Sequence, residues 1–164
     1  MKRLFLFTGY RLRVLHWKGK QLVGTSSFEP TENGLDKFRN YLLETENVTI
    51  LLECGLFQGS REEEKGNKQP FPFDVHHIDA VVLSHAHLDH SGRLPKLIAD
   101  GYGGRLHMTY ATSELLEIML KDAASLQQRD IEWENKRRRR AGKKEIEPLY
   151  TLEDVETTLA MCEG

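Results

Sequence analysis

Four side chains that bind metal ions in proteins lie within six residues, directly after the apolar run Ala80–Leu83: His85, His87, Asp89 and His90. One residue separates His85 from His87, so in an extended segment their imidazoles project to the same side. Asp89 and His90 follow at the expected turn into a helix and can present their donors to the same space. Neutral imidazole and carboxylate are the ligands that zinc prefers in catalytic sites. The pattern predicts a metal site between a strand and a helix; the alternative is a histidine-rich turn without metal.

Three segments carry a resemblance to a known family: Leu52–Arg61 with Phe-Gln-Gly, Pro70–Asp74 with Pro-Phe-Pro-Phe-Asp, and Ile78–Pro95 with His-x-His-x-Asp-His. Together they resemble the metallo-β-lactamase fold, and more narrowly its β-CASP branch of RNA-processing nucleases. The similarity continues through Tyr110–Thr112 to Glu147–Thr151 and so covers about residues 40–160. The first two pieces favour the RNA-processing branch over relatives that act on small molecules.

This resemblance implies a role for each residue of the cluster. His85 and His87 would hold one zinc ion, and Asp89 and His90 a second. Two ions ~3.5–4 Å apart can activate a hydroxide and clamp a phosphodiester for hydrolysis. Glu53 stands where the family normally carries Asp; the resemblance makes it a carboxylate that orients ligands or water, so Glu53 and Asp89 are the predicted catalytic residues. The alternative for Glu53 is an ordinary carboxylate at the end of a strand.

The family completes its two-metal site with a further His, a bridging Asp and a final His, all beyond the matched region. The remaining histidines lie in no ligand motif: His76 and His77 are expected on the surface, His107 in packing, and His16 has no assigned role. Four side chains divided over two ions leave each ion short of donors. We therefore expect the N-terminal part of a nuclease, as a fragment, a split gene product or a decayed relative, with a downstream chain supplying the rest.

Composition describes one ordinary soluble globular domain, since 39% of the 164 residues are hydrophobic and 29% are charged. The net charge of −2 does not by itself indicate a nucleic-acid binder. Cys54 and Cys162 are too few and too far apart for a disulfide framework, and Cys54 is expected to be packed. This usage favours a cytoplasmic setting. No segment is long enough to span a membrane.

Hydrophobic periodicity predicts alternating strands and helices. Strands are expected at 4–8, 41–44, 48–52, 79–84 and 105–110, with 41–52 as a hairpin. Helices are expected from His90 to about Ala99, from a cap at Thr112 or Ser113 to about Ala141-Gly142, and from a cap at Thr151–Asp154 to Met161. The second of these should bury Leu115, Leu116, Ile118, Met119, Ala123 and Leu126. Residues 10–39 are expected to form an atypical, loop-rich segment with a short helix at 35–40, and residues 111–164 to be helical.

A basic run near the end of the long helix is the one cationic cluster. It comprises Lys136–Arg140, followed by Lys143 and Lys144. Arg137, Arg138, Arg139 and Arg140 are the candidate RNA-binding residues, with phosphates as their ligands. The alternative is a solvated helix end, where the helix dipole favours cations. Trp133, one turn earlier, either stacks on a base or is partly buried in the fold.

The sequence thus predicts an α/β protein, the N-terminal half of an αβ/βα sandwich with a mixed sheet and long C-terminal helices, as one partial domain over residues 1–164. The predicted function is a zinc-dependent hydrolase resembling RNA-processing ribonucleases, with RNA as partner. One alternative is a non-catalytic metal-binding fragment or partner subunit. Another is a metallo-hydrolase of small esters, thioesters or lactams. Whether the chain is itself an enzyme stays open, because the later ligands are not in it.

Overall fold

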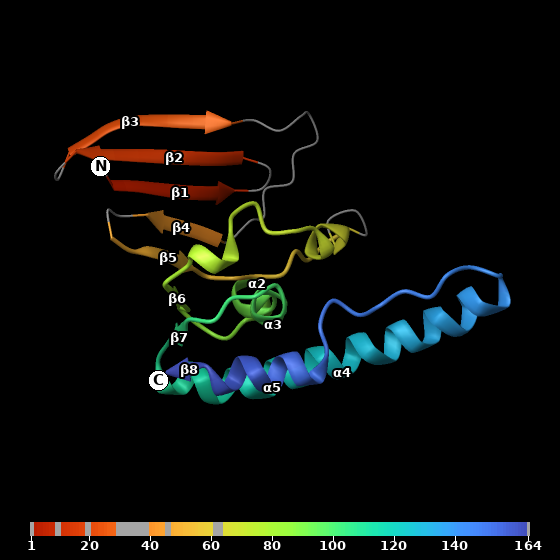
Figure 1. The fold of residues 1–164 in the computed structure, drawn as a ribbon. Helices are drawn as coiled ribbons and strands as arrows, with labels where there is room; N and C mark the ends of the chain where they lie inside the picture. Colours follow the sequence, from red (N-terminus) through yellow and green to blue (C-terminus); the bar gives the residue numbers. More distant parts are fainter. Residues whose placement is uncertain are drawn as a thin grey trace.

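A single mixed sheet organises the fold. The computed structural model describes residues 2–8, 11–18, 21–28, 40–44, 47–60 and 64–163. Its eight strands run in the order β3-β2-β1-β4-β5-β6-β7-β8 (Figure 1). They are β1 Lys2–Thr8, β2 Arg11–Lys18, β3 Gln21–Phe28, β4 Asn40–Glu44, β5 Thr49–Leu52, β6 Ala80–Val82, β7 Arg105–His107 and β8 Cys162–Glu163. The predicted α/β class and mixed sheet are confirmed.

The sheet changes from antiparallel to parallel at β5. Strands β3, β2, β1, β4 and β5 pair antiparallel with their neighbours, whereas β5–β6, β6–β7 and β7–β8 pair parallel. Parallel strands end at the same edge of a sheet. At that edge the Glu53 amide donates to the Val82 carbonyl (3.0 Å) and the Leu83 amide to the His107 carbonyl (2.9 Å). The segment that follows β6 is therefore fixed against its neighbours on both sides.

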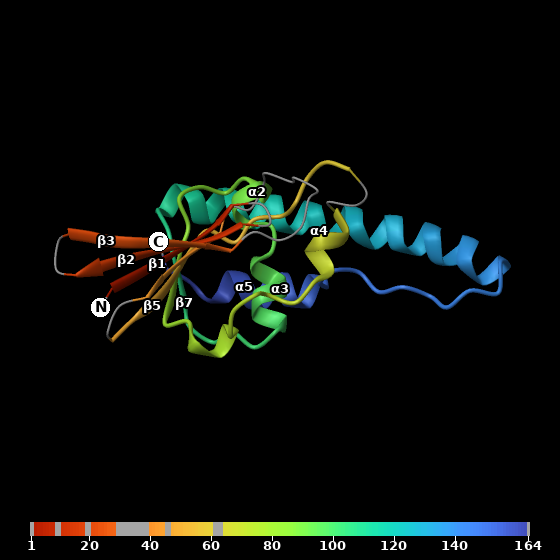
Figure 2. The same cartoon turned by 90° about the horizontal axis from the view of Figure 1, so that it is seen from above.

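In the part of the chain that the structure describes, α-helices and 3₁₀ turns accompany the sheet: α2 Leu88–Ser91, α3 Leu94–Ala99, α4 Tyr110–Arg140, α5 Leu152–Ala160, η1 Gly66–Lys68 and η2 Val75–His77. Helix α5 packs against both α3 and α4, and α2 packs against α4 (Figure 2). The core lies where these helices meet the parallel strands. Its fully buried side chains include Leu51, Val81, Leu94, Leu97, Leu106, Leu116, Leu120 and Val155. No helix in the described part of the chain is long and apolar enough to cross a bilayer.

The end of α4 and the segment after it form an arm, defined here as residues 131–147, that extends away from the sheet in both views (Figures 1 and 2). Gly142 adopts φ +65 and ends the helix, as predicted. The Lys143 amide donates to the Arg138 carbonyl (2.9 Å) and the Gly142 amide to the Arg139 carbonyl (3.1 Å). These are the two bonds of a Schellman motif, which reverses the chain direction. The chain then returns alongside α4.

The prediction of a loop-rich segment at 10–39 is wrong for its first two thirds, because 11–18 and 21–28 form β2 and β3. Apolar Leu12 and Val14 alternate with Arg11 and Arg13, and this period of two is typical of a strand. The basic residues obscured the alternation. Residues 29–39, with most of the expected helix at 35–40, lie outside the described residues, and Asn40 begins β4.

Several boundaries also differ from the predictions. The helix expected after His90 is divided into α2 and α3, with Pro95 in the first turn of α3. Strand β7 ends at His107, and Thr109 rather than Thr112 or Ser113 caps α4 by accepting a hydrogen bond from the Thr112 amide (3.2 Å). Strand β6 is shorter than 79–84, and the short strand β8 was missed. The β4–β5 hairpin and the capping box of α5 are confirmed.

Helix α4 buries a narrower stripe than predicted. Leu116, Leu120, Ala123 and Ala124 are buried, but Leu115, Ile118 and Leu126 are exposed, Ile118 to 66%. At 3.6 residues per turn, Ile118 points about 200° away from Leu116. The body of the protein contacts only one side of α4, so those predicted core positions are wrong.

Candidate metal centre

The loop between β6 and α2 and the first turn of α2 carry the predicted metal ligands. One ligand atom from each of His85, His87 and Asp89 lies within 4.8 Å of the other two. A single cation can therefore contact all three. His87 is exposed, and His85 and Asp89 are half-buried, so the cluster is reachable from the surface.

His90, the fourth predicted ligand, borders the same space. Its ring centroid lies 4.0 Å from that of His85. Its Nε2 atom is 3.7 Å from Oδ2 of Asp89. The structure thus brings all four side chains of the motif together, with His85, His87 and Asp89 as the tightest group.

Glu53 contacts this motif from the end of β5. Its Oε1 accepts a hydrogen bond from the Ser84 amide (3.1 Å), and its Oε2 lies 3.5 Å from His90 Nδ1. The Glu53 and His90 side chains are only 12% and 15% exposed. Glu53 has φ +64, a left-handed conformation that costs a non-glycine residue about 1–3 kcal/mol. The surrounding contacts hold the carboxylate in this place at the expense of backbone strain.

Backbone hydrogen bonds dock the segment after Glu53 onto α2. The Cys54 amide donates to the His90 carbonyl (2.6 Å), and the Leu56 amide donates to the Leu88 carbonyl (2.8 Å). Between these two residues lies Gly55, where a Cβ would stand 1.8 Å from the Asp89 carbonyl oxygen. Only glycine permits this approach. Gly55 was not predicted to have a role, and its position two residues after Glu53 was the only local signal.

Ser91 and Ser84 fix the loop from within, and both were missed as positioning residues. The buried Ser91 hydroxyl donates to the Ala86 carbonyl (2.9 Å). The Ser84 hydroxyl lies 2.8 Å from Nδ1 of His85, which leaves Nε2 of that ring for a ligand. Position within the motif was the only sequence signal for either serine.

Cys54 and Arg93 pack beneath the cluster. Cys54 is fully buried, and burial raises the pKa of its thiol to about 12, as expected of a packed, unreactive side chain. Arg93 is 1% exposed. Its guanidinium carbon lies 4.2 Å from the Phe71 ring centroid, and its Nη2 donates to the Gln69 carbonyl (3.1 Å). Desolvation lowers the pKa of Arg93. Arg93 therefore joins the 69–71 segment to the base of α3.

The donor set fits a divalent cation. It combines imidazole and carboxylate, which bind zinc in proteins. Oε2 of Glu53 is buried and accepts no hydrogen bond among the residues that the structure describes, with Nδ1 of His90 lying 3.5 Å away. Such a carboxylate oxygen is costly to bury unless a positive charge or a donor lies near it. A cation bound at this cluster would supply that charge.

The other histidines lie outside the cluster. His76 and His77 are exposed on η2, as predicted. His107 is also exposed, with Nδ1 3.5 Å from Oε2 of Glu163, so its expected role in packing is wrong. The alternation of β7 explains this, because Leu106 faces the core and its two neighbours face outward. The side chain of His16 is outside the described part.

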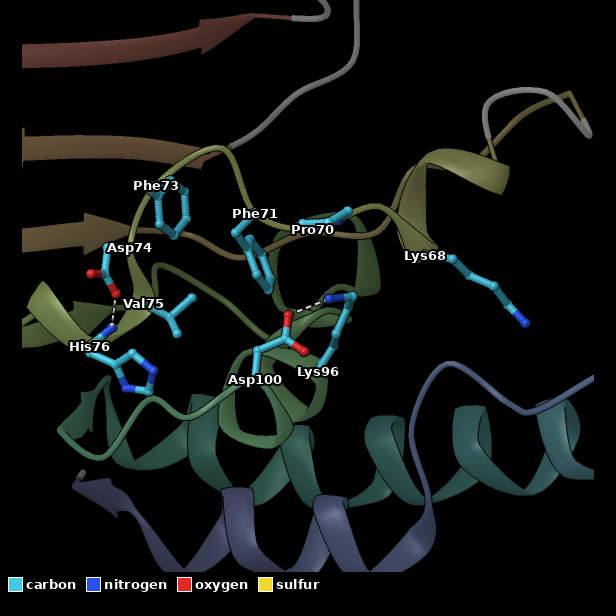
Figure 3. Close-up of a pocket in the computed structure, with 9 residues that line it drawn as sticks. All are labelled: Lys68, Pro70, Phe71, Phe73, Asp74, Val75, His76, Lys96 and Asp100. Carbon is cyan, nitrogen blue, oxygen red and sulfur yellow. Dashed lines mark hydrogen bonds and ion pairs between the residues drawn. The ribbon is translucent and has the colours of Figure 1, made fainter.

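A cavity of about 480 Å³ opens between the η1–η2 segment and α3 (Figure 3). Phe71 and Phe73 form one wall, and the ion pair of Lys96 with Asp100 lies opposite. The lining residues include none of the four predicted ligands. The candidate metal centre is therefore an open surface cluster separate from this cavity.

Three of the four predicted RNA-binding arginines are held by carboxylates of the arm. Arg137 and Arg138 lie 3.3 Å and 3.9 Å from Glu134, and Arg139 lies 3.1 Å from Glu145. Arg140 is exposed. Trp133 is 64% exposed, which rules out its partial burial as a core residue.

A mixed α/β fold with a His-x-His-x-Asp cluster after a parallel strand defines a class of metal-binding proteins. The family model described as "Metallo-beta-lactamase superfamily" matches residues 40–164. The chain belongs to this superfamily, as the resemblance implied.

Two relatives and one solved structure are similar to parts of this chain. Ribonuclease TTHA0252 of Thermus thermophilus is 44% identical over 110 residues, which are 67% of this chain and 21% of the relative. Transcription termination factor FttA of Methanothermobacter thermautotrophicus is 35% identical over 94 residues, 55% of this chain and 14% of the relative. The solved metallo-beta-lactamase fold protein YhfI from Bacillus subtilis is 19% identical, with a TM-score of 0.40, and the match covers 70% of this chain and 40% of that one. The chain thus spans about a fifth of the ribonuclease and less of the termination factor.

Proposed function

We propose that this chain carries metal-ligating residues of a zinc-dependent hydrolase that cleaves RNA. The observation that carries the proposal is the convergence of His85, His87 and Asp89 within 4.8 Å, on a chain of the metallo-beta-lactamase superfamily. The relative named a ribonuclease, at 44% identity, supports RNA as the substrate class.

In this proposal His85, His87, Asp89 and His90 hold the metal. A bound zinc ion supplies a Lewis acid for the phosphate and lowers the pKa of water. Glu53 fixes the ligand loop through the Ser84 amide and lies beside His90. Ser84 orients the His85 ring through Nδ1, so that the opposite nitrogen is the donor.

Cleavage of a labelled single-stranded oligoribonucleotide by the zinc-loaded chain tests the proposal. We expect EDTA-sensitive cleavage that His87→Ala abolishes and that the matched variant His77→Ala leaves unchanged. Nitrocefin and a thioester, assayed in parallel, should not be hydrolysed. Equal RNA cleavage by the wild-type chain and His87→Ala would contradict the proposal, and hydrolysis of a small substrate alone would favour the small-molecule alternative.

A second candidate function is metal binding without turnover by the donors that the described cluster holds. Four ligands divided between two ions give each only two, and catalytic zinc takes three from the protein. We therefore expect fewer than two zinc ions per chain by elemental analysis. Zinc binding without RNA cleavage would support this candidate, and two tightly held ions would contradict it.

A further inference from the structure

The arm has a defined structure of its own. The side-chain Nδ2 of Asn135 donates to the Ile146 carbonyl (2.8 Å), and the main-chain amide of Ile146 donates to Oδ1 of Asn135 (2.9 Å). Arg138 Nε donates to the Lys144 carbonyl (2.6 Å). These contacts join the returning segment to α4 well beyond the sheet (Figure 1). The charges on the arm are therefore held in fixed positions.

Positive charge is concentrated at the tip of the arm. Residues 134–145 contain seven Lys and Arg against two Glu, a net charge of +5. Glu132 and Glu147 reduce the net charge of the whole arm, residues 131–147, to +3. A helix C-terminus attracts cations, but its dipole corresponds to only about half a negative charge. The dipole of α4 does not account for this excess.

Internal ion pairs use only some of these cations. Arg137, Arg138 and Arg139 contact Glu134 or Glu145. The other four cations are exposed, and no ion pair holds them within the described residues: Lys136, Arg140, Lys143 and Lys144. The cations available to a partner are therefore not the four arginines predicted from the sequence. Only Arg140 belongs to both sets.

Trp133 adds an aromatic surface next to these cations. Its side chain is 64% exposed, and the guanidinium carbon of Arg137 lies 5.5 Å from its ring centroid. An exposed indole beside fixed cations offers a face on which a base can stack. Base stacking requires an unpaired base, which favours a single strand over a duplex.

We infer that the tip of the arm binds single-stranded RNA, with Lys136, Arg140, Lys143 and Lys144 contacting phosphates and Trp133 stacking on a base. The choice of RNA rests on the proposed function. The site is distinct from the metal centre, because none of its residues belongs to the His-x-His-x-Asp-His motif. It gives the chain a means of holding a strand that does not depend on metal.

Fluorescence anisotropy with a labelled oligouridylate, measured in EDTA over a range of salt concentrations, tests this inference without any cleavage. We expect Arg140→Ala/Lys143→Ala/Lys144→Ala to weaken binding about tenfold or more, and to lower the slope of log K against log salt by about 2, because three phosphate contacts are lost. The matched control removes three cations elsewhere, Arg105→Ala/Lys121→Ala/Arg129→Ala, and should bind like the wild-type chain.

A second measurement isolates Trp133. The chain has two tryptophans, and RNA should quench the fluorescence of the wild-type chain but not that of Trp133→Phe. Trp133→Ala should bind at least about fivefold more weakly, the lower end of what stacking contributes.

Equal weakening by the two triple variants would overturn the inference, as would equal affinity for duplex RNA or for vesicles of acidic lipid. Because cleavage is not measured, these results are independent of the hydrolase proposal. A chain that binds RNA through the arm but never cleaves it would contradict the proposed function alone.

Discussion

The candidate metal centre and the arm hold their side chains by different means. At the metal centre, main-chain hydrogen bonds fix the ligand loop, such as those from Cys54 to His90 and from Leu56 to Leu88. In the arm, side chains supply most of the contacts: Asn135 bridges to Ile146, and Glu134 and Glu145 pair with arginines. The metal centre lies against a buried core, and the arm is almost entirely polar.

The two regions therefore tolerate different changes. At the metal centre the main chains lie so close together that there is no room for an added atom. Salt hardly affects these main-chain hydrogen bonds. Exposed ion pairs tolerate many substitutions, yet salt screens them within about 10 Å at 0.1 M. Substitutions at four positions test this contrast between the two regions.

The largest effect is expected from Gly55→Ala. The new Cβ would stand 1.8 Å from the Asp89 carbonyl, so α2 must move. Overpacking of this kind costs about 3 kcal/mol at its upper end, and the shift should also lower zinc affinity. Urea unfolding and zinc titration measure both. Gly103→Ala is the matched control, because nothing lies within 4 Å of its Cβ position. Equal effects of the two substitutions would refute the tight approach.

His85→Ala should abolish most zinc binding while leaving the fold intact. Changes at residues that only support ligands already weaken metal binding about 10–100-fold, so loss of a ligand should cost at least as much. Elemental analysis after dialysis against limiting zinc measures the loss. His77→Ala, which removes an exposed histidine, should retain full zinc content. If His85→Ala retained it too, the ligand assignment would fail.

Glu53→Gln should weaken zinc binding about tenfold, because it keeps the side-chain shape and removes the charge beside His90. Glu53→Gly tests the backbone separately, since glycine adopts φ +64 without strain. We expect Glu53→Gly to bind zinc more weakly. Its folding stability should carry no cost from backbone strain at this position. The control is Glu117→Gln, an exposed carboxylate on α4 that pairs with Lys121. Zinc affinity unchanged in Glu53→Gln would mean that this carboxylate has no part in the site.

The smallest effect is expected from Asn135→Ala. Loss of its two hydrogen bonds to Ile146 should destabilise the arm locally by about 1 kcal/mol, with zinc binding unchanged. Faster hydrogen exchange of the Ile146 amide would report the opening. Gln128→Ala, which removes an exposed contact with Glu132, serves as the control. Reduced zinc binding in Asn135→Ala would show that the arm and the metal centre are coupled.

Local sequence signals predicted much of the fold. The β4–β5 hairpin, the capping box of α5 and the end of α4 at Gly142 each depend on neighbouring residues, and each is confirmed. The superfamily followed from the motif at 85–90 and its flanking segments. Strand β2 was missed because Arg11 and Arg13 concealed a period of two, and β3 was missed because its polar stretch at 24–27 resembles a loop.

Contacts between distant residues could not be predicted. Gly55 matters through Asp89, which lies 34 positions away, and no local pattern reports that approach. Likewise, the basic run gave no indication that Glu145 would return to Arg139 and leave Lys143 and Lys144 at the tip. The exposure of Ile118 depended on how much of α4 the body covers, and helical spacing alone does not determine this.

The net positive charge of the arm has a kinetic consequence. Residues 131–147 hold seven Lys and Arg against four Glu, a net charge of +3, and they project away from the sheet. A polyanion that diffuses near this end of the molecule is attracted to the arm, so encounters there begin at the tip. Raising the ionic strength should then slow association more than it speeds dissociation.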